Sequence, residues 1–197
     1  PHYLKRYARA AAGKKLFDAV IIDVAGPTTM ALNRFYTREF YADIRRALAP
    51  GGFMYAAVEA SEDLQGANAF LGGSIFNALN SVFEHVLIGA GTRLQFFACA
   101  DAGPLTFVRE ELFRRSVKAG ITTAYFQPEY FLFADEISPE KTALARRRLA
   151  PVSGVNSIFK PVSTYYQLAL WNILSGSGLQ TIFKRPASFL FVRMLLL

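Results

Sequence analysis

The sequence is poor in the residues that form disulfides and bind metal ions. Cys99 is the only cysteine, so no disulfide can form within the chain, which fits a reducing compartment. The two histidines, His2 and His85, have no second histidine or cysteine near them, which argues against a metal site. Cys99 lies in the apolar run "FFACA". We therefore expect it to be a small buried hydrophobic residue rather than a nucleophile.

Acidic residues are missing from the last part of the chain. There is no Asp or Glu between residues 141 and 197. The formal net charge of the whole chain is +7, and this segment contributes most of it. The bases of this segment are Lys141, Arg146, Arg147, Arg148, Lys160, Lys184, Arg185 and Arg193. A nucleic-acid patch would explain the charge, but not the apolar and aromatic character of the same segment. A juxtamembrane position explains both, so we expect a membrane-associated protein with this domain on the cytoplasmic side and no nucleic-acid partner.

The C-terminal segment also lacks an apolar run long enough to be a complete membrane span. "PVSTYYQLALWNILSGSGLQTIF" is free of charge but rich in Ser, Thr, Gln and Asn. Its Tyr165, Tyr166 and Trp171 are residue types that favour a membrane interface. The apolar run after Pro186 has about half of the roughly 20 residues that a span needs. We predict that residues 151–197 are a juxtamembrane or interfacial tail, which could include the start of a transmembrane helix.

The first 150 residues alternate between strand and helix patterns. "FDAVIID" and "FMYAAVEA" are short runs typical of strands buried on both faces. Between them, Phe40, Ile44, Ala47 and Leu48 recur at helical spacing, and Pro50-Gly51-Gly52 is expected to end the helix. "HVLIGAG" and "RLQFFACA" predict a hairpin. The order indicates an α/β fold: a partial Rossmann-like sheet with an antiparallel edge hairpin.

Three further segments predict helices. "ANAFLGGSIFNALNSVF" carries an apolar stripe, within which we interpret Gly72 and Gly73 as close-packing positions. "TFVREELFRRSVKAG" is amphipathic and is expected to end at Gly120. "SPEKTALARRRL" predicts a helix with Ser138 as its N-cap and Pro139 at its first position.

One long stretch resembles a known enzyme family. "FDAVIIDVAGPTTMALNRFYTREFYADIRRALAPGGFM" is similar to the spermidine synthase (polyamine aminopropyltransferase) family, most of all to bacterial members fused to transmembrane segments. The similarity continues through "RLQFFACADAGPLT", "GITTAYFQPEY", "ISPEKTALARRRL" and "VNSIFKPVSTYYQLALW". The resemblance implies a methyltransferase-type Rossmann fold without a metal or a tightly bound cofactor. It also implies decarboxylated S-adenosylmethionine as co-substrate and a polyamine as acceptor.

The donor-binding motifs of that family are not found in this sequence. The family has a Gly-rich turn after its first strand and an acid for the ribose, and the chain contains neither. It begins at Pro1 and stops within the apolar run "FLFVRMLLL". We therefore expect it to be the C-terminal part of a spermidine synthase-like domain and to be inactive alone.

The acids that the family's chemistry needs are partly replaced. Asp23 follows the first strand and is assigned to substrate binding by resemblance, although it could simply cap the next turn. Gly26 stands where the family has its proton-accepting Asp, and loss of a general base costs roughly a hundred- to ten-thousand-fold in rate. Glu59 could replace it, or could be a solvated loop acid. The family pattern is kept next to Gly26 by Pro27, Thr28 and Thr29. These residues either shape a pocket or only preserve a turn.

Other acceptor-side positions also differ from the family pattern. Ala57 stands near a position where many members carry Gln, and Ile158 stands where the fused members carry Asp. Asn156 matches the family at a neighbouring position. Tyr165 and Tyr166 could close the acceptor pocket or anchor a helix in a membrane interface, and the sequence slightly favours the anchor.

Three functions remain open on the sequence. The first is an aminopropyltransferase domain that is incomplete and catalytically degenerate. The second is a non-enzymatic cytoplasmic module of a membrane protein, which binds a polyamine or nucleoside-type small molecule or acts as a scaffold. The third is another methyltransferase-fold enzyme with a different acceptor.

Overall fold

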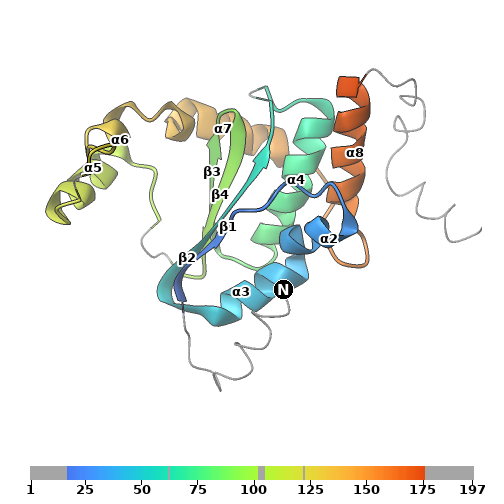
Figure 1. Ribbon diagram of the computed structural model, residues 1–197, viewed down its shortest axis with the longest axis horizontal. Coiled ribbons are helices and arrows are strands. Elements are labelled where there is room, and N and C mark those ends of the chain that lie inside the picture. The colour runs from blue at the N-terminus through green and yellow to red at the C-terminus, as the bar shows by residue number, and fades with distance from the viewer. Residues whose placement is uncertain (1–16, 62, 102–104, 122, 176–197) are drawn as a thin grey trace, which may run out of the picture.

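The fold is built on one mixed sheet. The computed structural model describes residues 17–61, 63–101, 105–121 and 123–175. Its strands are β1 (Phe17–Ile22), β2 (Leu48–Glu59), β3 (His85–Ala90) and β4 (Arg93–Cys99), in the order β1-β2-β4-β3 (Figure 1). β1 and β2 are parallel, and β4 pairs antiparallel with both β2 and β3. The predicted α/β Rossmann-like sheet with an antiparallel edge hairpin is confirmed.

The connection between β1 and β2 is helical, as the sequence predicts. It consists of α2 (Met30–Asn33), a 3-10 helix over Arg34–Tyr36 and α3 (Arg38–Ala47). The hydroxyl of Thr37 caps α3 by accepting a hydrogen bond from the backbone N–H of Phe40. Phe40 and Ile44 are buried against the sheet, so this helix is held by its apolar face.

The boundary between α3 and β2 differs from the prediction. Leu48 was assigned to the helical stripe, but it is the first residue of β2 and pairs with Phe17. The strand then continues through Gly51 and Gly52, with an irregular register opposite β1. Gly51 has a φ of +74°, and a Cβ on Gly52 would lie 2.9 Å from the carbonyl oxygen of Phe17. The two glycines therefore permit a bulged strand start rather than only ending the helix.

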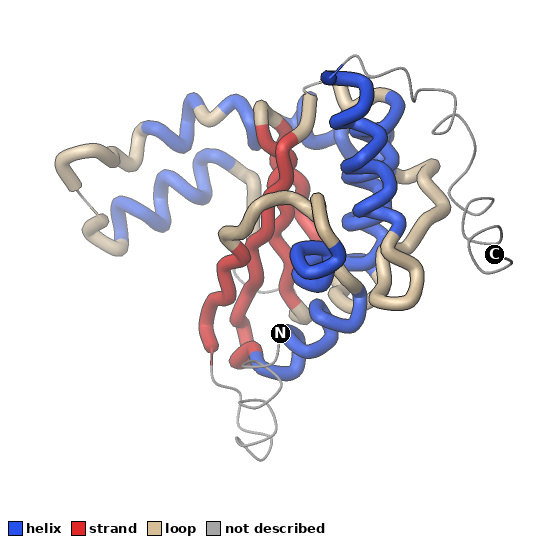
Figure 2. Tube along the Cα trace, turned by 45° about the vertical axis from the view of Figure 1, so that its right-hand side comes forward, coloured by secondary structure: helices blue, strands red, loops and turns tan. Residues whose placement is uncertain are grey.

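Helices α4 (Gly66–Asn80) and α8 (Val162–Ser175) lie side by side next to the strands (Figure 2). Gly72 and Gly73 are close-packing positions, as predicted: a Cβ on Gly73 would lie 2.5 Å from the side chain of Val152. The hydroxyls of Ser74 and Ser163 hydrogen bond across the interface at 2.8 Å. Residues beyond 150 therefore form part of the packed structure.

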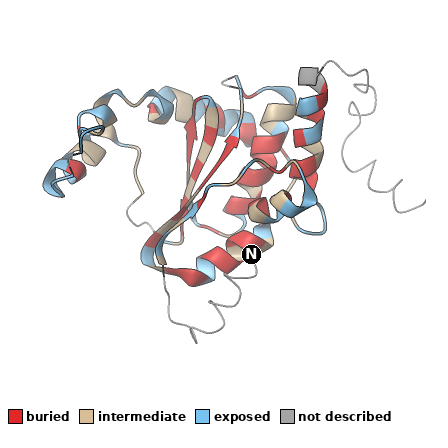
Figure 3. Ribbon diagram, viewed as in Figure 1, coloured by how far each residue is buried: buried red, intermediate tan, exposed pale blue. Residues whose placement is uncertain are grey.

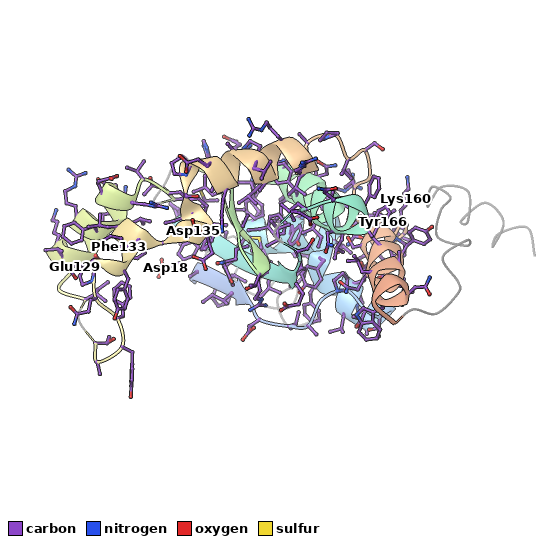
Figure 4. The ribbon with its side chains drawn as sticks, turned by 90° about the horizontal axis from the view of Figure 1, so that it is seen from above. Asp18, Glu129, Phe133, Asp135, Lys160 and Tyr166 are labelled. Carbon is purple, nitrogen blue, oxygen red and sulfur yellow. The ribbon has the colours of Figure 1, made fainter. Side chains whose placement is uncertain are left out.

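The opposite end of the molecule carries a helical arm. α7 (Pro139–Leu149), capped by Ser138 as predicted, packs on β3, and Arg146 donates a hydrogen bond to the carbonyl of Val86. Before it, α5 (Arg109–Lys118) and α6 (Tyr130–Phe133) pack mainly on each other and are largely exposed (Figure 3). Phe133, on this arm, lies far from Tyr166 on α8 (Figure 4).

The membrane prediction falls partly outside this part of the chain, since residues 176–197 are not described. Among residues 17–175, apart from the undescribed positions, no helix has the length and apolar character needed to cross a bilayer. The apolar run after Pro186, where the start of a transmembrane helix was predicted, lies outside the described residues. The predicted boundary at residue 150 stays a prediction.

Candidate functional site

A cavity of about 1000 Å³ opens at the carboxyl ends of β1 and β2. This is the edge where open α/β sheets place their ligands. The loop after β1, the end of β2, the start of β4, the start of α4 and one face of α8 contribute to it. The lining residues are Val24, Ala25, Gly26, Thr28, Ala57, Val58, Glu59, Ala60, Ser61, Gln65, Gly66, Ala67, Asn68, Arg93, Gln167, Leu170 and Trp171.

The loop after β1 is held in place by Tyr36. The Tyr36 hydroxyl lies 3.0 Å from the carbonyl oxygen of Val24, 3.2 Å from that of Ala25 and 3.2 Å from that of Ala57. This side chain is fully buried, and burial raises its pKa to about 12, with Arg93 acting against the shift and Asp23 adding to it. The hydroxyl therefore stays protonated at neutral pH and remains a donor to the backbone that forms the cavity wall.

The C-terminal segment is joined to the same region through Asn156. Its side-chain nitrogen donates to Asn33 Oδ1 at 2.9 Å and to the carbonyl of Tyr36 at 2.8 Å. Its side-chain oxygen accepts from the backbone N–H of Ser163 at 3.2 Å, at the start of α8. Asn156 is completely buried, so these hydrogen bonds are protected from water. One side chain thus fixes α8 relative to the elements that follow β1.

The predicted catalytic positions are only partly brought together. Gly26 and Glu59 both line the cavity, whereas Asp23 is exposed and is not among the lining residues. Of the three predicted loop residues, Thr28 lines the cavity and Pro27 does not. Thr29 is the N-cap of α2, where its hydroxyl accepts a hydrogen bond from Leu32 N at 3.2 Å.

The charged groups of the cavity form an exposed ion pair. Glu59 and Arg93 are directly opposite each other on β2 and β4. Arg93 Nε lies 3.3 Å from Glu59 Oε1, and the two side chains are 42% and 76% exposed for Arg93 and Glu59 respectively. Arg93 Nε is buried and has no hydrogen bond, so the pair is not aligned for one. Glu59 is therefore a solvent-facing carboxylate that already has a cationic neighbour.

The space next to Gly26 is occupied by a glutamine from α8. A Cβ at position 26 would lie 3.1 Å from Gln167 Oε1 and 3.7 Å from its amide carbon. Gln167 is only 8% exposed. Its amide makes no hydrogen bond to a described residue. A neutral amide thus lies beside the position where the family places a carboxylate.

The tyrosines that were considered for the acceptor pocket are not among the residues lining the cavity. Tyr166 stacks on Phe70 of α4, with ring centroids 5.1 Å apart, and Tyr165 contacts Tyr166 edge-on at 5.4 Å. Burial raises the pKa of both tyrosines, and for Tyr165 the neighbouring Tyr166 adds to the effect. In the described structure the pair packs α8 onto α4.

Sequence reasoning missed the face of α8 that does reach the cavity. Gln167, Leu170 and Trp171 line it at spacings of three and four residues, which is one face of a helix. This spacing was visible in the sequence next to the two tyrosines. Arg93 was also missed, because its position opposite Glu59 depends on the register of β2 and β4. Among the described residues, no cluster of three metal-binding side chains occurs.

Comparisons with known proteins agree with the resemblance noted in the sequence. The chain is 50% identical over 54 residues to polyamine aminopropyltransferases of Mycobacterium tuberculosis (strain H37Rv) and Mycobacterium bovis. The match covers 27% of this chain and 10% of those relatives, so the chain matches about a tenth of their length. No family model matches the chain.

Two solved structures are also similar. A probable spermidine synthase from Corynebacterium glutamicum has a TM-score of 0.37 and 21% identity, covering 66% of this chain and 50% of that chain. Human methyltransferase-like protein 13, in complex with SAH, has a TM-score of 0.40 and 15% identity, covering 79% and 58%. The resemblance of this chain to the polyamine aminopropyltransferase (spermidine synthase) family is confirmed by the sequence match.

Proposed function

We propose, from this resemblance, that the chain carries the acceptor-side part of a spermidine synthase-like aminopropyltransferase domain whose dedicated proton acceptor is lost. The observation that carries the proposal is Gly26, which lines the cavity within a loop that otherwise keeps the family pattern. The ligand would be a polyamine or a nucleoside-type small molecule, with decarboxylated S-adenosylmethionine as co-substrate in any transfer that remains.

The family's reaction explains why Gly26 matters. A neutral amine nitrogen of the acceptor attacks the propyl carbon of the donor, the bond from that carbon to the sulfonium sulfur breaks, and methylthioadenosine leaves. The attacking nitrogen has to give up a proton, and the family uses a carboxylate near it as the base. Glycine has no group that accepts a proton. Of the described residues that line the cavity, only Glu59 has a carboxylate, and it is largely exposed and paired with Arg93 at 3.3 Å.

A binding role without transfer is the second candidate. Three acceptor-side positions carry Gly26, Ala57 and Ile158 instead of polar family residues. The backbone around them nevertheless remains pinned by Tyr36 and Asn156. A retained shape with altered chemistry favours a binding or scaffold module.

The acid-free tail supports a membrane-associated position on the cytoplasmic side. Recovery of the full-length protein in the soluble fraction after detergent-free lysis and ultracentrifugation would contradict that position.

The test is a binding measurement paired with a product assay. The full-length protein that carries this chain is titrated with methylthioadenosine by calorimetry and is then incubated with decarboxylated S-adenosylmethionine and putrescine. We expect binding with little or no release of methylthioadenosine. Release that survives both Asp23→Asn and Glu59→Gln would overturn the view that these two acids are the only ones left for the chemistry. Absence of binding would favour the scaffold role.

A further inference from the structure

The cavity is built for a ligand of different charge from a polyamine. We propose that its acceptor-side ligand is a zwitterion, an aliphatic amine with a carboxylate at the far end, rather than a diamine that carries two positive charges. This inference rests on the proposed function, because it takes the cavity to be the acceptor-side site. Three observations on the described residues carry it.

The first observation is the neutral group beside Gly26. Gln167 Oε1 lies 3.1 Å from the point where a Cβ of residue 26 would be, so the amide occupies the region into which a carboxylate at position 26 would extend. An amide gives an ammonium group one carbonyl oxygen but no negative charge. Bringing an ammonium out of water is costly unless an opposite charge meets it. With a neutral amide beside Gly26 and no carboxylate at that position, the site offers no opposite charge to a second ammonium group.

The second observation is the unused hydrogen-bonding capacity of Gln167. Its side chain is more than nine-tenths buried, lines the cavity and makes no hydrogen bond to a described residue. Neither amide atom is among the fully buried polar atoms that lack a partner, so water in the cavity reaches them and a ligand group can take the place of that water. The amide NH₂ is a good donor to a carboxylate, and a charged acceptor makes the stronger hydrogen bond.

The third observation is the positive group in the wall. Arg93 lines the cavity, and its buried Nε has no hydrogen bond. A guanidinium matches the planar geometry of a carboxylate. The pair with Glu59 is exposed and not aligned for a hydrogen bond, so little is lost when a ligand rearranges it.

The overall charge of the wall leads to the same conclusion. The described lining contains one acid, Glu59, and one base, Arg93, so the side chains that line the cavity carry no net negative charge for a dication. A zwitterion with one ammonium group needs no second carboxylate in this wall, and its carboxylate has Arg93 as a cationic partner. Leu170 and Trp171 supply an apolar wall for the methylene chain between the two charges.

The test compares three probes with the same chain of four methylene groups: putrescine, aminobutanol and δ-aminovalerate. Calorimetric titration of the protein should show δ-aminovalerate binding at least about tenfold more tightly than putrescine, with aminobutanol between them. Gln167→Glu restores a carboxylate at the same place with the same shape and should reverse the order. Gln127→Glu makes the same change of charge at an exposed position on the arm and should leave the order unchanged.

Two results would overturn the inference. One is putrescine as the tightest probe of the unmodified protein, and the other is an order that Gln167→Glu does not alter. A parallel titration of the full-length protein with methylthioadenosine separates the two proposals. If methylthioadenosine binds and none of the three probes does, the zwitterion is wrong and the proposed function stands. If neither methylthioadenosine nor any probe binds, the proposed function falls and the inference falls with it.

Discussion

The two walls of the cavity are held in opposite ways. On one side, the loop around Gly26 is fixed through buried polar groups: the Tyr36 hydroxyl and the Asn156 amide are both 0% exposed. On the other side, Glu59 and Arg93 form an ion pair that is largely open to water. Buried hydrogen bonds are costly to remove, whereas exposed ion pairs contribute little. The shape of the site is thus anchored independently of its charges, so a catalytic carboxylate can be lost without loss of the fold.

Removal of the Asn156 amide should cause the largest effect on the anchored side. Asn156→Ala leaves Asn33, the carbonyl of Tyr36 and the N–H of Ser163 without their partner in a buried place. We expect the free energy of unfolding to fall by about 2 to 4 kcal/mol, measured by urea denaturation. Asn80→Ala, at an exposed position at the end of α4, is the control and should change stability by less than about 0.5 kcal/mol. Equal effects of the two variants would contradict the anchoring role.

Removal of the Tyr36 hydroxyl should have the next largest effect. Tyr36→Phe keeps the buried ring but leaves three carbonyl oxygens without this donor. We expect a loss of about 1 to 3 kcal/mol in the free energy of unfolding. Tyr55→Phe is the matched control, because the half-buried Tyr55 hydroxyl makes no hydrogen bond to a described residue. If both variants unfold at the same urea concentration, the hydroxyl does not hold the loop.

The same tyrosine predicts a pH dependence. The pKa of Tyr36 is raised from 10.0 to about 12, chiefly by burial. Below pH 10 this tyrosine is protonated in both the folded and the unfolded state, so its contribution is fully present. Between pH 10 and about 12 the unfolded state releases the proton first, and stability falls by about 2 to 3 kcal/mol. Urea titrations across this range should show a smaller fall for Tyr36→Phe. An identical fall in both proteins would mean that other groups, such as the buried Tyr41, account for all of it.

Substitutions in the exposed Glu59–Arg93 ion pair should have the smallest effect on the free energy of unfolding. Glu59→Gln removes one member of an exposed pair, so we expect a change in the free energy of unfolding of about 1 kcal/mol or less. A double-mutant cycle with Arg93→Gln measures the interaction itself and should give a coupling energy below about 1 kcal/mol. A coupling energy of several kcal/mol would mean that the exposed ion pair stabilises the fold as much as the buried hydrogen bonds do, and would contradict the comparison.

The sequence was sufficient to predict the elements that depend on local patterns. The alternation of apolar strand patterns with helices carrying an apolar stripe predicted the β1–α3–β2 order and the hairpin, because these periods are local. The prediction that β1 is buried on both faces was wrong: β1 is an edge strand of the described sheet, and Ile21 is 67% exposed. Gly72 and Gly73 were correctly interpreted, since a close-packed helix face requires small residues. Leu48 was misassigned because an apolar residue after a helix fits either a last helical turn or a first strand residue.

The composition of the cavity was less predictable, because it depends on tertiary contacts. Gln167 reaches Gly26 only because α8 packs on α4 and its start is fixed by Asn156. From the sequence, Tyr165 and Tyr166 looked like interface or pocket residues, whereas in the structure Tyr166 stacks on Phe70. The resemblance pointed to the loop that lines the cavity, but it gave no information on which side chain lies beside Gly26.

The central claim is that the loop after β1 keeps its shape and lacks only its base. The most direct measurement is the rate of methylthioadenosine release from decarboxylated S-adenosylmethionine and putrescine by the full-length protein that carries this chain and by its Gly26→Asp variant. The new carboxylate would extend into the region that the flexible end of Gln167 occupies, so this side chain has to move aside in the variant. The account predicts release by the variant at least about a hundredfold faster than by the unmodified protein. Equal rates in the two proteins, whether fast or absent, would contradict it.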